Sequence, residues 1–109
     1  MALYSSAPQV NEQRLWNNIM ETSTFGSHSS IPGGMSRLSL SDDDKSVRHW
    51  FITKARILGC EVRVDEMGNI FAIWHGNSGI KSKYDPIGMG SHLDTQPIGM
   101  FFDNFCLDK

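Results

Sequence analysis

The chain has 109 residues, with 10 lysines and arginines against 12 aspartates and glutamates, and its formal net charge is −2. This near-neutral balance lacks the clustered basic charge of a nucleic-acid-binding face, and no run approaches the roughly 18 apolar residues that span a membrane. No basic segment followed by an apolar run opens the chain, and Cys60 and Cys106 form no paired motif, so we expect a cytoplasmic protein without a secretory signal.

A first helix is predicted over residues 10–22, because apolar side chains recur there at the spacing of one helical face. These side chains are Val10, Leu15, Trp16, Ile19 and Met20. Phe25 and Gly26 interrupt the pattern. The next residues, 23–40, are rich in serine, glycine and proline, so we expect a loop that is unusually long for a compact domain.

A second helix is predicted to begin after Ser41, whose hydroxyl can cap the first turn while Asp44 reaches back from the third position. An apolar stripe follows, and Gly59 supplies the C-terminal stop. The stripe consists of Val47, Phe51, Ala55 and Leu58. We interpret the aspartates at 42–44 as a helix start rather than a metal site, since successive helical positions cannot all face one ion.

A β-hairpin is predicted after the second helix. Apolar and polar side chains alternate over residues 60–65, residues 66–69 are turn-forming types, and an apolar run follows at 70–74. A further apolar run with glycines, residues 86–91, predicts a buried strand that ends at His92. This order of elements indicates an α/β domain whose site lies at the C-terminal end of a strand.

The segment that carries chemistry is residues 90–97. His92 can bind a metal through one ring nitrogen, while Asp94 can hold the other nitrogen and fix the tautomer. Asp103 adds a carboxylate able to ligate or bridge, and zinc sites use these ligand types. Taken alone, the His-x-Asp pattern is more often structural than metal-binding. The other histidines fit surface, turn or structural positions: His28, His49 and His75.

Residues 90–97, followed by Gly99 and Asp103, resemble the first metal-binding motif of the zinc-dependent amidohydrolases. More narrowly, they resemble the family of N-carbamoyl-L-amino-acid hydrolase, β-alanine synthase (β-ureidopropionase) and allantoate amidohydrolase. Residues 33–45 resemble that family's glycine-rich segment leading into its second helix, and residues 64–71 resemble its hairpin. The three motifs occur in the family's order.

The resemblance implies a two-zinc site, whose ligand types also suit other divalent ions. At the matching positions, His92 corresponds to the histidine that binds one ion, and Asp103 corresponds to the aspartate that bridges both ions. Asp94 corresponds to the carboxylate that orients the histidine. Two such ions hold a bridging water, lower its pKa and polarise the scissile carbonyl. The implied reaction hydrolyses a linear ureido or amide C–N bond, converting a carbamoyl amino acid to the free amino acid, ammonia and carbon dioxide.

The resemblance also implies that residues 1–109 form the N-terminal portion of a di-zinc aminopeptidase-like catalytic domain, with two helices, a hairpin and one central strand. Family members are homodimeric and several times longer. Their general-base glutamate, further metal ligands and inserted dimerisation domain correspond to sequence beyond Lys109. We therefore expect a partial metal-binding domain that is inactive alone. Two alternatives are a non-catalytic truncated paralogue or interaction module, and a di-zinc aminopeptidase that cleaves peptides.

Overall fold

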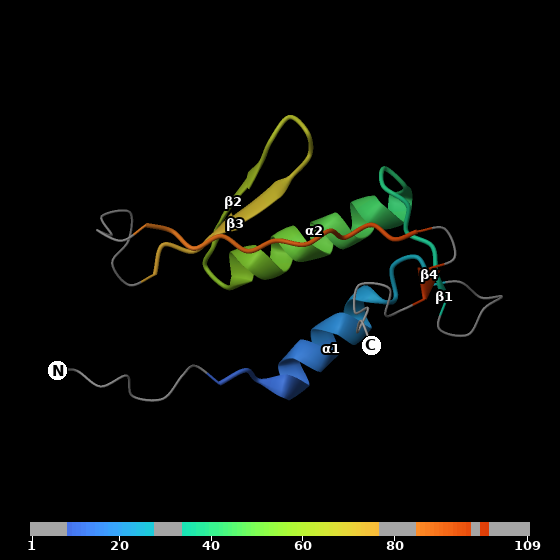
Figure 1. Cartoon of the computed structure of the whole chain (residues 1–109), viewed down its shortest axis with the longest axis horizontal. Helices are drawn as coiled ribbons and strands as arrows, with labels where there is room; N and C mark the ends of the chain where they lie inside the picture. Colours follow the sequence, from blue (N-terminus) through green and yellow to red (C-terminus); the bar gives the residue numbers. More distant parts are fainter. Residues whose placement is uncertain (1–8, 28–33, 77–84, 97–98, 101–109) are drawn as a thin grey trace, which may run out of the picture.

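The structure, a computed structural model, describes residues 9–27, 34–76, 85–96 and 99–100. Within these ranges the chain forms helices and two separate antiparallel strand pairs (Figure 1). In chain order the elements are α1 (Glu12–Thr22), β1 (Gly34–Met35), α2 (Asp42–Ile57), β2 (Glu61–Val64), β3 (Ile70–Ile73) and β4 (Gly99–Met100). The predicted α/β class is confirmed in this form.

Helix α1 begins two residues later than the apolar spacing predicts and ends where it predicts. Its N-cap is Asn11, whose side chain accepts a hydrogen bond from the backbone N–H of Arg14 at 2.8 Å. Near its C-terminal end, the Glu21 carboxylate lies 2.9 Å from the ammonium of Lys54 in α2, and this bond lowers the pKa of Glu21. Because the two side chains are 41% and 46% exposed, the ion pair joins the two helices only weakly.

Helix α2 begins at the predicted cap. The Ser41 hydroxyl accepts a hydrogen bond from the backbone N–H of Asp44 at 3.1 Å. The Asp44 carboxylate accepts from the N–H of Leu40, also at 3.1 Å, so it reaches one residue before the cap. The chain leaves the helix through Gly59, whose φ of 80° favours glycine, as predicted.

The prediction of a buried apolar stripe on α2 is only partly correct. Val47 and Ala55 are buried and Phe51 is half-buried. Leu58, however, is 68% exposed, and it is the C-cap residue rather than part of the helix. The buried part of the stripe therefore ends at Ala55.

The predicted hairpin is confirmed: β2 and β3 pair antiparallel, from Glu61 opposite Ile73 to Val64 opposite Ile70. Its turn is held by the Asp65 carboxylate, which accepts from the backbone N–H groups of Met67 at 3.0 Å and Asn69 at 2.7 Å. Gly68 adopts a φ of 85° within this turn. Arg48 of α2 donates to the carbonyl oxygen of Gly68, which ties the hairpin to the helix.

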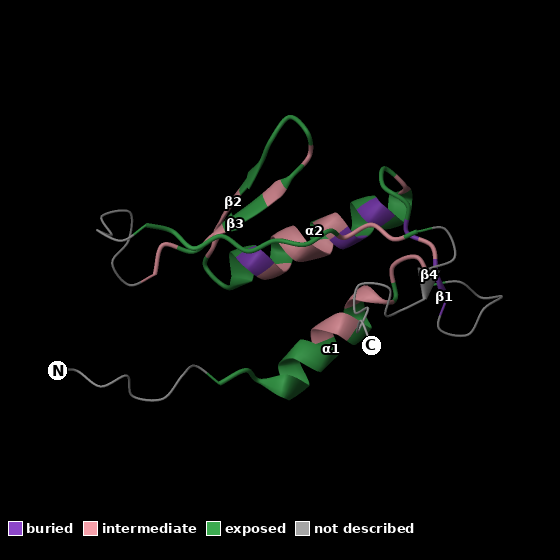
Figure 2. Ribbon diagram, in the orientation of Figure 1, coloured by how far each residue is buried: buried purple, intermediate pink, exposed green. Residues whose placement is uncertain are grey.

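The predicted buried strand at 86–91 is wrong. These residues form no strand, and none of the described residues pairs with them. Ile87 is 92% exposed and Met89 is 95% exposed, and the whole segment is exposed in Figure 2. The apolar run has the composition of an inner strand, but a strand forms only where a neighbouring backbone satisfies its hydrogen bonds.

The predicted loop at 23–40 contains a strand that the sequence pattern did not reveal. Gly34 of β1 pairs with Met100 and Met35 pairs with Gly99, so the β1–β4 pair is antiparallel. Met35 also bridges to Ser27. These short pairings bring the segment after α1 against Gly99–Met100, which follows the His92 segment in the sequence.

The apolar core of the described residues is small. Its buried side chains are Met35, Val47 and Ala55, which lie on β1 and α2 (Figure 2). Large apolar side chains elsewhere remain exposed, including that of Trp74, which is 72% exposed. In the described part, neither helix has the length and apolar character needed to cross a membrane.

Candidate functional site

His92 and Asp94 contact each other as the sequence predicts. The Nδ1 atom of His92 lies 3.1 Å from the Asp94 carboxylate oxygen Oδ1 and 2.9 Å from the Asp94 carbonyl oxygen. Both neighbours of Nδ1 are hydrogen-bond acceptors, so Nδ1 carries the ring proton when the imidazole is neutral. The lone pair of that tautomer is then on Nε2.

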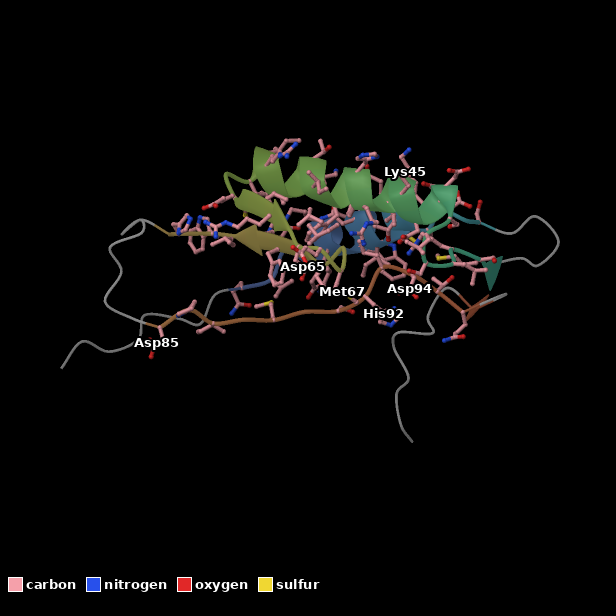
Figure 3. All side chains as sticks on the ribbon, turned by 90° about the horizontal axis from the view of Figure 1, so that it is seen from above. Lys45, Asp65, Met67, Asp85, His92 and Asp94 are labelled. Carbon is pink, nitrogen blue, oxygen red and sulfur yellow. The ribbon has the colours of Figure 1, made fainter. Side chains whose placement is uncertain are left out.

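The His92 imidazole is accessible from solvent. Its side chain is 61% exposed and that of Asp94 is 44% exposed. Figure 3 shows both residues on the extended segment, on the side of the molecule away from Lys45 of α2. Nε2 accepts no hydrogen bond from any described residue, so the arrangement offers one oriented nitrogen ligand to an incoming ion.

The rest of the predicted ligand set is not brought together in the described residues. Asp103 lies outside them. No cluster of three or more histidine, cysteine, aspartate or glutamate side chains with metal-binding spacing occurs in residues 9–27, 34–76, 85–96 and 99–100. The donor set that the structure describes therefore fits one ligand of a metal site rather than a complete site.

Arg37 fixes the position of the His92 segment, and sequence reasoning did not single it out. Its Nε donates to the carbonyl oxygen of Leu93 at 2.8 Å. Its backbone N–H donates to the Thr95 hydroxyl, and the Thr95 N–H donates to the Arg37 carbonyl, both at 2.8 Å. The only sequence signal was its place within residues 33–45.

The Arg37 guanidinium is buried, with 5% of the residue exposed. Its Nη1 donates to the carbonyl oxygens of Thr22 at 2.9 Å and Phe25 at 2.7 Å, at the C-terminal end of α1. Burial lowers the pKa of Arg37, and the nearby carboxylates of Asp44, Asp43 and Asp94 oppose that shift. A cation is favourable at this place, because helix C-termini carry partial negative charge.

Gly26 makes room for Arg37. It has a φ of 83°, and a Cβ there would lie 2.8 Å from the carbonyl oxygen of Ser36 and 2.9 Å from the Cβ of Arg37. The carbonyl of Gly26 accepts from the N–H of Ser36 at 2.8 Å. A side chain at position 26 would therefore displace the segment that carries Arg37.

The other described histidines, His75 and His49, lie outside the His92–Asp94 pair. His75 Nε2 lies 2.9 Å from the Glu61 carboxylate, which also accepts from Arg63 at 2.6 Å. These bonds lower the pKa of Glu61, with His75 as the larger cause. His49 is exposed on α2, and His28 lies outside the described residues. His75 was predicted to lie in a turn; it follows β3 outside any turn and contacts Glu61 of the hairpin.

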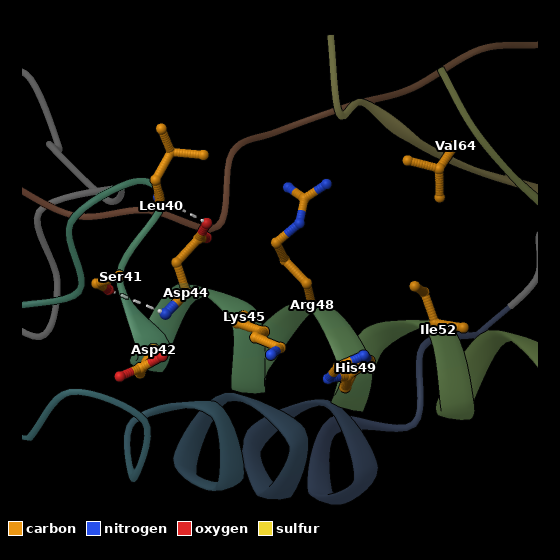
Figure 4. Close-up of a pocket in the computed structure, with 9 residues that line it drawn as sticks. All are labelled: Leu40, Ser41, Asp42, Asp44, Lys45, Arg48, His49, Ile52 and Val64. Carbon is orange, nitrogen blue, oxygen red and sulfur yellow. Dashed lines mark hydrogen bonds between the residues drawn. The ribbon is translucent and has the colours of Figure 1, made fainter. Parts of the chain in front are cut away.

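A pocket of about 380 Å³ lies between the N-terminal half of α2 and the hairpin (Figure 4). Its polar side chains are mixed in charge, and two of them, Ser41 and Asp44, already form the helix cap. Its lining residues are Leu40, Ser41, Asp42, Asp44, Lys45, Arg48, His49, Ile52 and Val64. Neither His92 nor Asp94 lines it, so this pocket is separate from the candidate ligand.

Known amidohydrolases resemble this chain over most of its length. It is 36% identical over 103 residues to the N-carbamoyl-L-amino-acid amidohydrolase of Rhizobium meliloti, a match covering 94% of this chain and 24% of that protein. It is 30% identical over 99 residues to the ureidoglycolate hydrolase of Arabidopsis thaliana, covering 91% and 20% of the two chains. No profile of a known protein family matches the chain.

Solved structures of amidases also resemble this chain. An amidase of the hydantoinase/carbamoylase family from Burkholderia multivorans superposes with a TM-score of 0.76 and 40% sequence identity, covering 87% of this chain and 22% of that one. A family member from Burkholderia ambifaria superposes with a TM-score of 0.76 and 38% identity. The chain thus spans about a quarter of the length of the relatives that it matches.

Proposed function

Because the chain is homologous to the hydantoinase/carbamoylase family of amidohydrolases and corresponds to about a quarter of such an enzyme, we propose that it supplies part of a metal-dependent hydrolytic site. The bond cleaved is a C–N bond of a carbamoyl or ureido compound. The named activities of the relatives, on N-carbamoyl-L-amino acids and on ureidoglycolate, support this substrate class.

The observation that carries the proposal is the contact between His92 and Asp94. Two oxygens of Asp94, 2.9 and 3.1 Å away, accept hydrogen bonds from Nδ1–H, which leaves the lone pair of Nε2 available to a metal ion. A metal-binding histidine is normally held in this way, by an acceptor on its other nitrogen. In this proposal Asp94 orients the ring, while His92 and Asp103 are metal ligands.

Zinc is the proposed metal, with two ions in the complete site, and other divalent ions suit the same ligand types. When bound, the metal would lower the pKa of a water molecule and polarise the carbonyl group of the substrate. The residues of this chain hold the ring of His92 in one tautomer and present its nitrogen to solvent. The fold assigned with this proposal is the N-terminal portion of a di-zinc aminopeptidase-like domain.

The 109-residue chain alone is proposed to be inactive. A catalytic zinc ion normally has three protein ligands and a water, whereas this chain offers His92 and Asp103. A cytoplasmic, homodimeric enzyme is the proposed context. The two alternatives are a non-catalytic interaction module and a peptide-cleaving enzyme.

The experiment exchanges the matched 103-residue stretch of the Rhizobium meliloti enzyme for this chain. We expect the chimera to release ammonia from an N-carbamoyl amino acid in a metal-dependent reaction. His92→Asn should abolish that activity, whereas the control His75→Asn, at a histidine paired with Glu61, should retain it. A folded chimera that is inactive supports the interaction module, and one that cleaves only dipeptides supports the aminopeptidase.

A further inference from the structure

We propose that Arg37 is a positioning residue for the His92–Asp94 pair, an inference that rests on the proposed metal-binding role of His92. Arg37 reaches this pair across 56 positions of sequence, through the carbonyl of Leu93. It acts on the pair through the backbone and touches neither the imidazole nor the carboxylate by any hydrogen bond described in the structure.

Arg37 fixes the two peptide groups on either side of the Asp94 Cα. The preceding peptide contains the Leu93 carbonyl, which accepts from Arg37 Nε at 2.8 Å. The following peptide contains the Thr95 N–H, which donates to the Arg37 carbonyl at 2.8 Å. The same following peptide contains the Asp94 carbonyl oxygen that accepts from His92 Nδ1. Both backbone dihedrals of Asp94 are therefore constrained by one residue.

The constraint matters because the bonds to His92 come from an exposed, unpaired segment. Residues 85–92 have no strand partner among the described residues, and His92 is itself 61% exposed. Short local contacts alone leave such a segment with several conformations, since ordering each residue costs conformational entropy. Arg37 attaches the segment to the C-terminal end of α1, where Thr22 and Phe25 hold its Nη1.

A guanidinium is suited to this role and a lysine is not. Arg37 uses Nε and Nη1 at the same time, toward carbonyl groups of two separate segments, and these donors are fixed in one plane. A lysine ammonium is a single flexible point and cannot hold both segments in that geometry. With 5% of the residue exposed, Arg37 is also too buried to bind a substrate carboxylate directly.

The test is the tautomer of His92 in the metal-free 109-residue chain, read from the nitrogen NMR resonances of its imidazole. The wild-type chain should show the Nδ1–H form, because two acceptors face that nitrogen. Arg37→Lys should shift the population toward the Nε2–H form. Arg48→Lys is the matched control, since Arg48 also donates to a backbone carbonyl, that of Gly68 in the hairpin turn. It should leave the His92 tautomer unchanged.

A second variant keeps the proposal testable if Arg37→Lys fails to fold. Thr95→Val removes the hydroxyl that accepts from the Arg37 N–H but leaves the guanidinium in place. It should shift the His92 tautomer in the same direction, by less. Zinc affinity should fall with the Nδ1–H population, by about 10–100-fold for Arg37→Lys, in the range seen when outer-shell partners of a metal ligand are lost.

Two results separate this inference from the proposed function. If zinc does not bind His92 in the wild-type chain, the proposed function fails, yet a tautomer shift in Arg37→Lys still establishes the positioning role. If Arg37→Lys or Thr95→Val leaves the hairpin resonances native and His92 remains entirely Nδ1–H, the positioning role is overturned.

Discussion

The Nε atom of Arg37 lies 2.8 Å from the carbonyl oxygen of Leu93, the residue between His92 and Asp94. This bond joins the glycine-rich segment before α2 to the segment that carries the candidate ligand. Two motifs that are far apart in sequence thus form one unit, with a buried cation at its centre.

Removing the carboxylate of Asp94 should weaken metal binding at His92. Asp94→Ala leaves Nδ1 with only the backbone carbonyl at 2.9 Å, so the imidazole is held less firmly. We expect zinc affinity to fall about 10–100-fold, measured by titration calorimetry. Asp85→Ala, at an exposed aspartate of the same segment, is the control and should leave affinity unchanged. Equal losses in the two variants would show that only net charge matters.

A side chain at position 26 should damage the Arg37 unit. Gly26→Ala places a methyl group 2.8 Å from the Ser36 carbonyl oxygen and forces alanine to adopt a φ of 83°. The control is Gly59→Ala, which has a similar φ of 80° but open space around the added Cβ. The left-handed conformation alone costs about 1–2 kcal/mol, so the control should lose about that much. Gly26→Ala should lose more in urea unfolding, and equal losses would contradict the packing argument.

Loss of the Ser41 hydroxyl should destabilise α2. Ser41→Ala removes the acceptor that the Asp44 N–H uses at 3.1 Å, and the lost N-cap should cost about 1 kcal/mol of unfolding free energy. Ser46→Ala is the matched control, because the Ser46 hydroxyl donates to the Asp42 carbonyl on an exposed helix surface. Thermal unfolding followed by circular dichroism measures both. If Ser46→Ala loses as much stability as Ser41→Ala, the loss does not arise from the N-cap.

Acid should weaken the hairpin. The Asn69 contacts lower the pKa of Asp65, and the contacts with His75 and Arg63 lower the pKa of Glu61. A carboxylate with a lowered pKa stabilises the fold above its ordinary pKa, here 3.8 for Asp65 and 4.5 for Glu61. This stabilisation is lost as pH falls through the lowered values. Amide-exchange protection of β2 and β3 should therefore decrease in that acid range. Protection that is independent of pH would contradict the carboxylate contacts.

The acid effect can be assigned to one residue. Asp65→Asn removes the charge of the side chain that accepts from Met67 and Asn69. Its hairpin should start with less protection at neutral pH and lose less on acidification than the wild-type hairpin does. If protection of the Asp65→Asn hairpin depends on acid as strongly as that of the wild type, the acid effect arises from Glu61 instead.

Local sequence signals predicted the parts of the fold that local contacts determine. Ser41 capped α2, Gly59 ended it, and residues 66–69 connected the two strands of the hairpin, all over short stretches of sequence. The His92–Asp94 contact was predictable for the same reason, since the residues are two apart.

The features that sequence reasoning missed depend on distant partners. The β1–β4 pair joins Gly34 to Met100, and Arg37 binds Leu93, and no local pattern encodes either pairing. The run at 86–91 was assigned as a buried strand from its composition, but strand formation needs a neighbouring backbone that the described residues do not supply. The buried arginine gave no signal because arginine is usually an exposed residue.

Zinc titration of the 109-residue chain, followed by the imidazole nitrogen resonances of its histidines, tests directly whether His92 binds a metal through Nε2. We expect the Nε2 resonance of His92 to move first as zinc is added, while Nδ1–H stays hydrogen-bonded to Asp94. The resonances of His75, which is bonded to Glu61, should remain in place at the same zinc concentration. Zinc that leaves His92 unchanged, or that binds it through Nδ1, would contradict its assignment as a metal ligand held by Asp94.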